Sequence, residues 1–114
     1  MKNISLALMG IALFSTPLFS TPLFASDRLD DGKRNYEAIC SSCHDTGVED
    51  APMVGKPEDW AERPKLWEAV LFEHANSGYI KMPAKGAADY ATEYDVDSAA
   101  EYMMHLTYPN RPTD

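Results

Sequence analysis

The stretch ICSSCHDTG, residues 39–47, contains both cysteines of the chain, Cys40 and Cys43, and His44 follows the second one directly. The cysteines are three positions apart, so on a helical turn both sulfurs lie on the same side. Two thiols followed at once by an imidazole form a donor set that suits several kinds of chemistry. The surrounding sequence decides among them.

Four interpretations of this motif compete. A Cys40–Cys43 disulfide would close a very short loop and stabilise the fold little. A thiol–disulfide catalyst is expected within a βαβ unit, and the sequence shows no convincing strand. A closed zinc site requires two more ligands at a comparable spacing, whereas His74 and His105 are isolated. Cys-x-x-Cys-His is also the attachment pattern of covalent c-type haem, and this is the interpretation that the sequence favours.

The first 25 residues have the pattern of a secretory signal peptide. A basic residue near the start is followed by the apolar run ISLALMGIALF, and small residues stand at the expected cleavage point in Phe24-Ala25-Ser26. Residues 3–25 carry no charge and are long enough to span a bilayer, so an uncleaved anchor is the alternative. Pro17 and Pro22 argue against one continuous membrane helix.

Removal of this leader leaves a small acidic domain, residues 26–114. It has 9 basic and 18 acidic residues, which gives a net charge of −9. A domain of this size buries only a marginal apolar core, so we expect a bound cofactor to complete it. The acidic charge disfavours nucleic acids and anionic membranes as partners. We expect a periplasmic protein, or a membrane-anchored one if the leader is retained.

Hydrophobic periodicity predicts an all-α domain of about four helices. The expected helices are Asp30 to Ser42 with Asp30 or Asp31 as N-cap, a short turn over Pro57–Arg63, a helix from Pro64 to just before Gly78, and a last helix over 93–107. Thr92 and Asp95 form a capping-box signature in front of the last helix. The loops 44–56 and 77–91 are long for a compact domain, which suggests that they have a function.

The second loop contains YIKMPAKG, residues 79–86, and provides the best candidate for a second iron ligand. Pro83 biases Met82 towards an extended conformation, so the loop can present its thioether to the iron on the side away from His44. The competing donors are Met53, Met103, Met104, His74 and His105. Met103 and Met104 are expected to pack in the core, Met53 is expected to stay on the side of His44, and His74 ends an amphipathic stripe. A His/Met pair fills both axial positions and raises the reduction potential relative to two histidines. This favours electron transfer over peroxide or oxygen chemistry.

Longer stretches of the mature chain resemble a known family. GKRNYEAICSSCH, GVEDAPMVGKPEDWAER, LFEHANSGYIKMPAKG and DSAAEYM, within about residues 30–106, are similar to class I c-type cytochromes and look most like the bacterial monohaem cytochrome c5 type. The resemblance implies a small cytochrome c fold around one covalent haem c with its iron. It also implies that Cys40 and Cys43 form the thioethers and that His44 and Met82 ligate the iron.

The resemblance implies roles for five further residues. The carbonyl of Pro52 would accept the N–H of the proximal histidine and fix its ring. Trp60 and Arg63 lie where the family often contacts the haem propionates, although a core tryptophan and a surface arginine are equally expected. Gly32 and Tyr36 would meet the terminal helix, near Tyr102.

One departure from the subgroup concerns the stretch after the Met-Pro loop, where members often carry two bridged cysteines. Here that stretch is GAADYATEYDVDS, without cysteine. No disulfide can hold the loop, so we expect Met82 to detach from iron more easily than in bridged relatives.

The acidic charge of the domain, the leader and the expected His/Met ligation of the iron together predict a soluble periplasmic one-electron carrier. Its expected partners are redox protein donors and acceptors of a respiratory chain, including membrane complexes, with no small-molecule substrate and a monomeric or weakly dimeric state. Lys81 and Lys85 flank Met82 and would form a small basic collar for docking, ordinary solvated lysines being the alternative. The rival functions are an electron-entry subunit of a larger complex and a haem enzyme or sensor with an open iron site.

Overall fold

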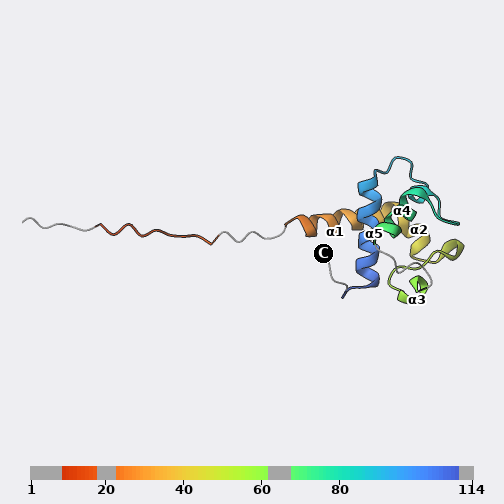
Figure 1. The fold of residues 1–114 in the computed structure, drawn as a ribbon, viewed down its shortest axis with the longest axis horizontal. Coiled ribbons are helices and arrows are strands. Elements are labelled where there is room, and N and C mark those ends of the chain that lie inside the picture. The colour runs from red at the N-terminus through yellow and green to blue at the C-terminus, as the bar shows by residue number, and fades with distance from the viewer. Residues whose placement is uncertain (1–8, 18–22, 62–67, 111–114) are drawn as a thin grey trace, which may run out of the picture.

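The computed structural model describes residues 9–17, 23–61 and 68–110. These residues form an all-α domain, as predicted, in which the only extended pairing is an isolated bridge between Tyr79 and Met82. Figure 1 shows the helices gathered in one body, with residues 9–17 extended away from it. Among the described residues, no helix combines the length and the apolar composition that crossing a bilayer requires.

The first helical segment is longer than predicted. Helix α1 spans Leu23–Asn35, continues as a π-helix over Tyr36–Cys40 and ends as the short helix α2, Ser41–His44. The prediction that Asp30 or Asp31 is the N-cap is therefore wrong, because both lie inside α1. The carboxylate of Asp31 instead pairs with Arg34 and accepts the hydroxyl of Tyr94, so its polar group is satisfied across helices.

The π-helix changes the direction in which the cysteine motif faces. Its backbone hydrogen bond runs from the N–H of Ser41 to the carbonyl of Tyr36, five residues back. One extra residue in a helical turn rotates everything after it by about 100°. Gly32 can therefore contact helix α5 while Cys43 and His44 line a cavity.

The remaining helices are α3, Pro57–Trp60, α4, Glu68–Ser77, and α5, Glu93–Thr107. Helix α3 has its proline in the first turn, as predicted, and α4 ends before Gly78, whose φ of +85° suits a glycine. The predicted start of this helix at Pro64 lies outside the described residues. Short 3-10 turns occupy Val48–Asp50 and Ala84–Ala87 within the two long loops.

Helix α5 has the predicted bounds because its N-terminus is fully capped. Thr92 Oγ1 accepts the N–H of Asp95 at 3.2 Å, and a carboxylate oxygen of Asp95 accepts the N–H of Thr92 at 2.9 Å. The carboxylate of Asp95 also accepts the hydroxyl of Thr92. The hydrogen bonds that this carboxylate accepts from the N–H and the hydroxyl of Thr92 hold the pKa of Asp95 below its usual value, since they favour the charged form.

Helices α1 and α5 cross in close contact, and the contact depends on a glycine. A Cβ placed on Gly32 would lie 2.2 Å from the carbonyl oxygen of Ser98 and 3.0 Å from Cβ of Tyr102. One turn later, the rings of Tyr36 and Tyr102 lie 5.7 Å apart between centroids. The expected meeting of Gly32 and Tyr36 with the terminal helix is confirmed.

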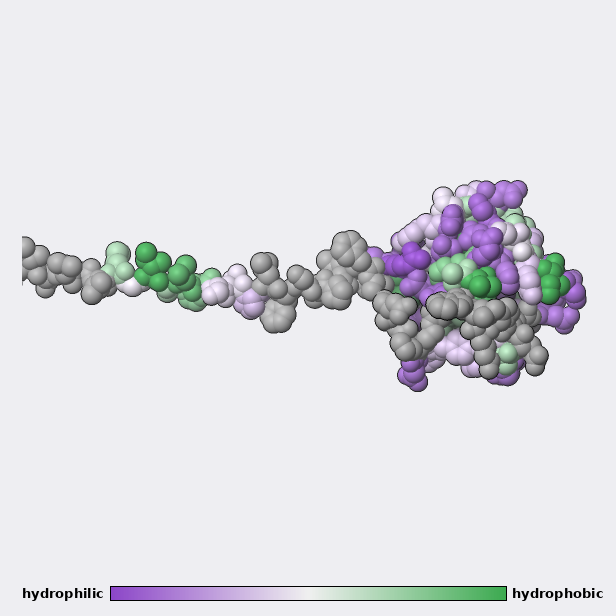
Figure 2. Space-filling model, viewed as in Figure 1, coloured by the Kyte–Doolittle hydropathy of each residue, from purple (hydrophilic) through white to green (hydrophobic). Residues whose placement is uncertain are grey.

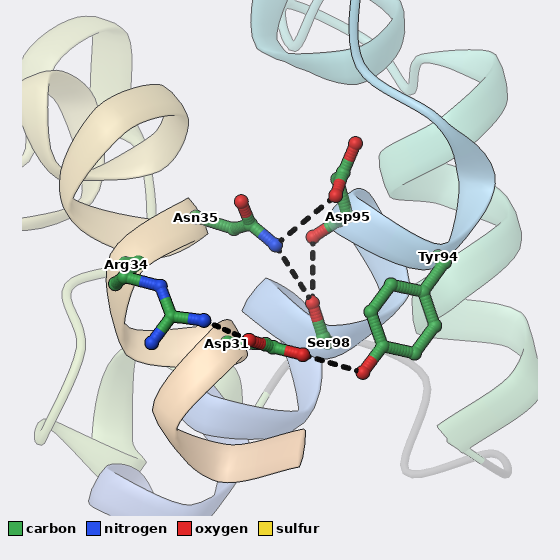
Figure 3. A network of polar contacts seen from close by, with 6 residues as sticks. All are labelled: Asp31, Arg34, Asn35, Tyr94, Asp95 and Ser98. Atoms are coloured by element: carbon green, nitrogen blue, oxygen red, sulfur yellow. Dashed lines mark hydrogen bonds and ion pairs between the residues drawn. The ribbon is translucent and has the colours of Figure 1, made fainter. Parts of the chain in front are cut away.

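Polar side chains fix the same crossing at the start of α5, as Figure 3 shows. Asn35 donates to Ser98 Oγ at 3.1 Å, and Tyr94 donates to Asp31 at 2.8 Å. The crossing therefore combines a close backbone approach with directional hydrogen bonds, which sets both the separation and the rotation of the two helices.

Replacing Gly32 by alanine should destabilise the holoprotein. The added methyl group overlaps the Ser98 carbonyl, so we expect a loss of about 2 kcal/mol in the free energy of unfolding despite alanine's higher helix propensity. Urea unfolding followed by circular dichroism measures it. The matched control is Lys33→Ala on the exposed face of α1. A Gly32→Ala protein as stable as this control would contradict the close approach.

The cap of α5 predicts a pH-dependent effect of Asp95→Ala. At pH 7 the variant loses the capping box and about 1 kcal/mol of stability. Because the folded-state pKa of Asp95 is below its ordinary value of 3.8, the carboxylate stabilises the fold above that value and loses this effect as the pH falls further. The stability gap between wild type and variant should therefore close in acid, measured by thermal unfolding between pH 7 and 3. A gap that persists unchanged at pH 3 would count against the charged cap.

Candidate cofactor site

A cavity of about 360 Å³ lies among the cysteine motif, the two long loops and helices α4 and α5. Its volume falls within the usual range of cofactor pockets. The apolar part of its lining comes from elements far apart in sequence: Ile39, Leu71, Ala75, Ala100, Met103 and Met104. The domain thus leaves a large, mainly apolar space between its helices and loops, and its small size led us to expect a cofactor there.

Cys40 and Cys43 both line this cavity, and both are free thiols. Burial raises the pKa of Cys40 to about 11, so this thiol is protonated at neutral pH. Cys43 lies on the exposed side. Both cysteines therefore border the cavity, Cys40 partly buried and Cys43 exposed.

His44 is buried at 7% exposure, and its ring is held by two neighbours. Nδ1 lies 2.7 Å from the carbonyl oxygen of Pro52, so the N–H is on this nitrogen and Nε2 is the basic one. The indole of Trp60 stacks on the imidazole, with 6.1 Å between centroids and 15° between planes. Both contacts fix the ring's orientation within the cavity, and the hydrogen bond is the one that the family resemblance implied.

The indole N–H of Trp60 donates to the carbonyl of Met53 at 3.0 Å. In this structure the tryptophan also lines the cavity, so it joins the loop after His44 to the cavity wall. The N–H is thus occupied by a backbone partner, and the role of Trp60 near a propionate stays a prediction. Arg63 lies outside the described residues.

Met82 lines the same cavity from the second loop. Its backbone exchanges two hydrogen bonds with Tyr79, of 3.0 and 2.9 Å, which close a tight turn over Ile80 and Lys81. Ile80 has a φ of +52°, a left-handed conformation that is costly for a β-branched residue. The turn fixes the backbone of Met82 at the cavity, as its extended conformation before Pro83 led us to expect.

The loop continues in a left-handed conformation after Met82. Lys85, Gly86 and Ala87 have φ values of +55°, +59° and +67°. Gly86 packs against the π-helix, where an added Cβ would lie 3.2 Å from the carbonyl oxygen of Ile39. Packing and backbone geometry therefore position this loop, which has no disulfide.

Three rival donors also line the cavity: Met103, Met104 and His74. The two methionines are buried in the core, as expected of packing residues. His74 stacks flat on Tyr79, with 3.9 Å between centroids and 7° between planes. From the sequence, His74 was visible only as the end of an amphipathic stripe. Its stacking on Tyr79 was missed, because a contact between a helix residue and a loop residue leaves no local sequence pattern.

Sequence reasoning also missed a contact between Tyr36 and Asp45. The buried phenol donates to the carboxylate of Asp45, the residue after His44. Burial, together with this hydrogen bond, raises the pKa of Tyr36, so the phenol remains a neutral donor. The contact joins the start of the π-helix to the end of the cysteine motif.

The expected basic collar around Met82 is not formed. Lys85 is half-buried, and its ammonium donates to the carbonyl of Ala91 at 2.8 Å. Lys81 lies 3.1 Å from a carboxylate oxygen of Asp50 on the other loop. The prediction failed because sequence spacing does not show where long side chains turn.

These residues fit a covalent haem: two free thiols, a buried oriented imidazole and a thioether line one apolar cavity in an all-α domain. Fold and site define a class I c-type cytochrome. The chain belongs to the family described as cytochrome c oxidase, cbb3-type, subunit III, whose model matches residues 27–103.

Curated relatives support this assignment. Cytochrome c-555 of Chlorobaculum tepidum is 38% identical over 77 residues, covering 64% of this chain and 71% of the relative. Cytochrome c-551 of Halorhodospira halophila is 47% identical over 66 residues, covering 57% and 80%. The chain is therefore a small c-type cytochrome with covalent haem c as its cofactor, and it is an electron carrier and not an enzyme.

Two solved structures are similar to the described fold. A cytochrome c in an electron-transfer complex with nitrite reductase matches with a TM-score of 0.62 and 30% identity, over 68% of this chain and 94% of that one. Reduced cytochrome c551 of Ectothiorhodospira halophila matches with a TM-score of 0.55 and 39% identity, over 66% and 97%. Both likenesses span nearly the whole of the solved chains.

Substitutions of Trp60 should separate its two contacts. Trp60→Phe keeps an aromatic ring against His44 but loses the hydrogen bond to Met53, which we expect to cost about 1 kcal/mol. Trp60→Leu loses both, at a cost of about 2 to 3 kcal/mol. Urea unfolding of the holoproteins, followed by the haem absorption, measures both. Equal losses for the two variants would show that the stack contributes nothing.

Proposed function

We propose that the protein is a periplasmic one-electron carrier whose haem is attached through Cys40 and Cys43 and whose iron is ligated by His44 and Met82. The observation that carries the proposal is that all four side chains line one apolar cavity. Among the candidate donors that the structure describes, Met82 alone lies in a loop and has its backbone held at the cavity by paired hydrogen bonds.

A bound haem would supply a one-electron couple, and the chain's own residues would hold its surroundings in place. Pro52 and Trp60 hold the imidazole of His44 in one orientation. The carbonyl acceptor strengthens the imidazole as a donor, because it draws on the N–H of the opposite nitrogen. The buried side chains Met103 and Met104 exclude water from the inner wall. Little rearrangement then accompanies a change of charge.

The proposed export to the periplasm rests on the first 25 residues. Residues 9–17 are extended, and Met9, Ile11, Leu13 and Phe14 are each more than 85% exposed. Such an apolar segment has no place in the folded domain, which supports its removal as a signal peptide of residues 1–25. Helix α1 runs through the expected cut, and cleavage there leaves Gly32 and its contact with α5 in the mature domain, residues 26–114.

The alternative is an electron-entry subunit of a larger redox complex. Two observations support it: the family description names an oxidase subunit, and one structural neighbour is a cytochrome c bound to nitrite reductase. A free carrier migrates as a monomer or weak dimer, whereas a subunit elutes with a larger assembly. Size-exclusion chromatography of native periplasmic extract, with detection at the haem absorption, distinguishes the two. Both forms use redox proteins as partners.

Replacing Met82 tests the proposed ligand pair. Met82→Ala should remove the near-infrared absorption of the oxidised haem that reports thioether–iron ligation, and Met82→His should lower the reduction potential while keeping the iron six-coordinate. Met53→Leu is the matched control, because Met53 does not line the cavity. An oxidised Met82→Ala protein that retains the thioether absorption would exclude Met82 as the ligand.

A further inference from the structure

The turn of residues 79–82 carries the proposed methionine ligand at the edge of the domain. Figure 1 shows this segment, in teal, at the end of the domain opposite residues 9–17, and Figure 2 shows a hydrophobic group among hydrophilic residues at the same end. Ile80, within the turn, is 82% exposed. The paired hydrogen bonds between Tyr79 and Met82 shape the turn from within and join no helix to it. The attachment of the turn to the helices therefore depends on contacts that leave it.

One such contact is the stack between the imidazole of His74 and the phenol ring of Tyr79. The ring centroids lie 3.9 Å apart and the planes differ by 7°, so the two rings lie face to face. His74 is half-buried in the last turn of α4, and Tyr79 is 40% exposed. Both rings belong to the chain, so the contact forms between protein groups and needs no cofactor as a partner.

Helix α4 gives His74 a fixed base. Before it in sequence, Leu71 packs against the buried core of α5. After it, Ala75 packs against a second buried cluster, and Asn76 donates to the carboxylate of Asp97 on α5 at 2.8 Å. Side chains on both sides of His74 thus hold α4 to α5, and the imidazole meets the turn from a helix that is itself anchored.

The chain reverses sharply between the two stacked rings. Gly78 has a φ of +85°, and a Cβ there would lie 3.1 Å from the carbonyl oxygen of Met82 and 3.0 Å from the N of Ala84. The reversal places the backbone of Met82 close to the end of α4. A movement that separates the rings must therefore also move Met82, because Tyr79 is bonded to it through the backbone.

Other connections to the turn are weaker or are excluded by the sequence. The ion pair between Lys81 and Asp50 leaves the turn, but the two side chains are 58% and 92% exposed, and pairs so exposed contribute little. The chain has two cysteines, Cys40 and Cys43, and both belong to the haem-attachment motif. No disulfide can then hold the turn, which leaves the ring stack as its directional contact with α4.

We propose that His74 is a positioning residue whose stack on Tyr79 holds the thioether of Met82 in place for the iron. The inference rests on the proposed carrier function and its ligand pair, and it adds the residue that keeps the methionine side closed. His74 then acts through Tyr79 and the backbone of the turn, and not as a ligand itself.

The test follows the near-infrared thioether–iron absorption of the oxidised holoprotein during heating, alongside helix content by circular dichroism. His74→Ala removes the stack and should increase the equilibrium constant for detachment of Met82 about fivefold, the factor expected of one stacked aromatic pair. The absorption should therefore disappear at a lower temperature than in the wild type while the helices remain folded. His74→Phe keeps a flat ring against Tyr79 and should restore the absorption to near the wild-type temperature.

The matched control is Leu71→Ala. Leu71 lies on the same helix and lines the same cavity, but it packs against the core and not against the turn. This variant should lower the temperatures of absorption loss and helix unfolding together. Tyr79→Leu removes the other ring and should act like His74→Ala, and the double variant should be no worse than either single one, because both remove the same contact.

Additive effects of His74→Ala and Tyr79→Leu would overturn the proposal, because the two rings would then act independently. A His74→Phe protein that loses the absorption as easily as His74→Ala would overturn it too. If His74→Ala does not fold, Tyr79→Leu on the exposed turn provides the same comparison with Leu71→Ala. The proposed ligand pair and carrier function fail separately: a wild-type holoprotein without the thioether absorption, or without reversible one-electron oxidation, would show this before any variant is compared.

Discussion

The absence of a side chain at Gly32 is the constraint on which the rest of the structure depends. It allows the backbone of α1 to approach the Ser98 carbonyl of α5 within a distance that excludes any other residue. With these helices fixed, the π-helix and α2 follow in a set direction, and the buried face of α5 becomes the inner wall of the cavity. A contact between two helices thus determines where the cofactor lies.

The two loops depend on different kinds of support. The loop after His44 is held by side chains that donate to or stack on its neighbours, with Trp60 reaching the Met53 carbonyl and His44 reaching Pro52. The loop that presents Met82 is held mainly by its own backbone, through paired hydrogen bonds and a run of left-handed residues. The loop after His44 is therefore held by packed rings, and the loop that carries Met82 is held mainly by the geometry of its backbone turns.

The sequence was most informative where the signals are local. The capping pair Thr92 and Asp95 predicted the bounds of α5, and the cysteine spacing predicted the cofactor. It was least informative where tertiary contacts decide the outcome. Asp31 resembles an N-cap in sequence but bonds across helices, and Lys85 resembles a docking residue but reaches a nearby carbonyl. No local sequence pattern predicts which tertiary partner such a side chain contacts.

The π-helix at Tyr36–Cys40 implies that the direction in which the cysteines face depends on the number of residues before them as well as on their identity. An insertion of one residue turns the thiols about a quarter of the way around the helix axis, and a deletion turns them back. A comparison of sequences that considers only substitutions does not detect such a change, because every residue can be retained while the helical register is lost. In this domain, tolerance of small insertions and deletions should therefore end abruptly between Gly32 and Cys40, and resume only in the loops beyond the motif.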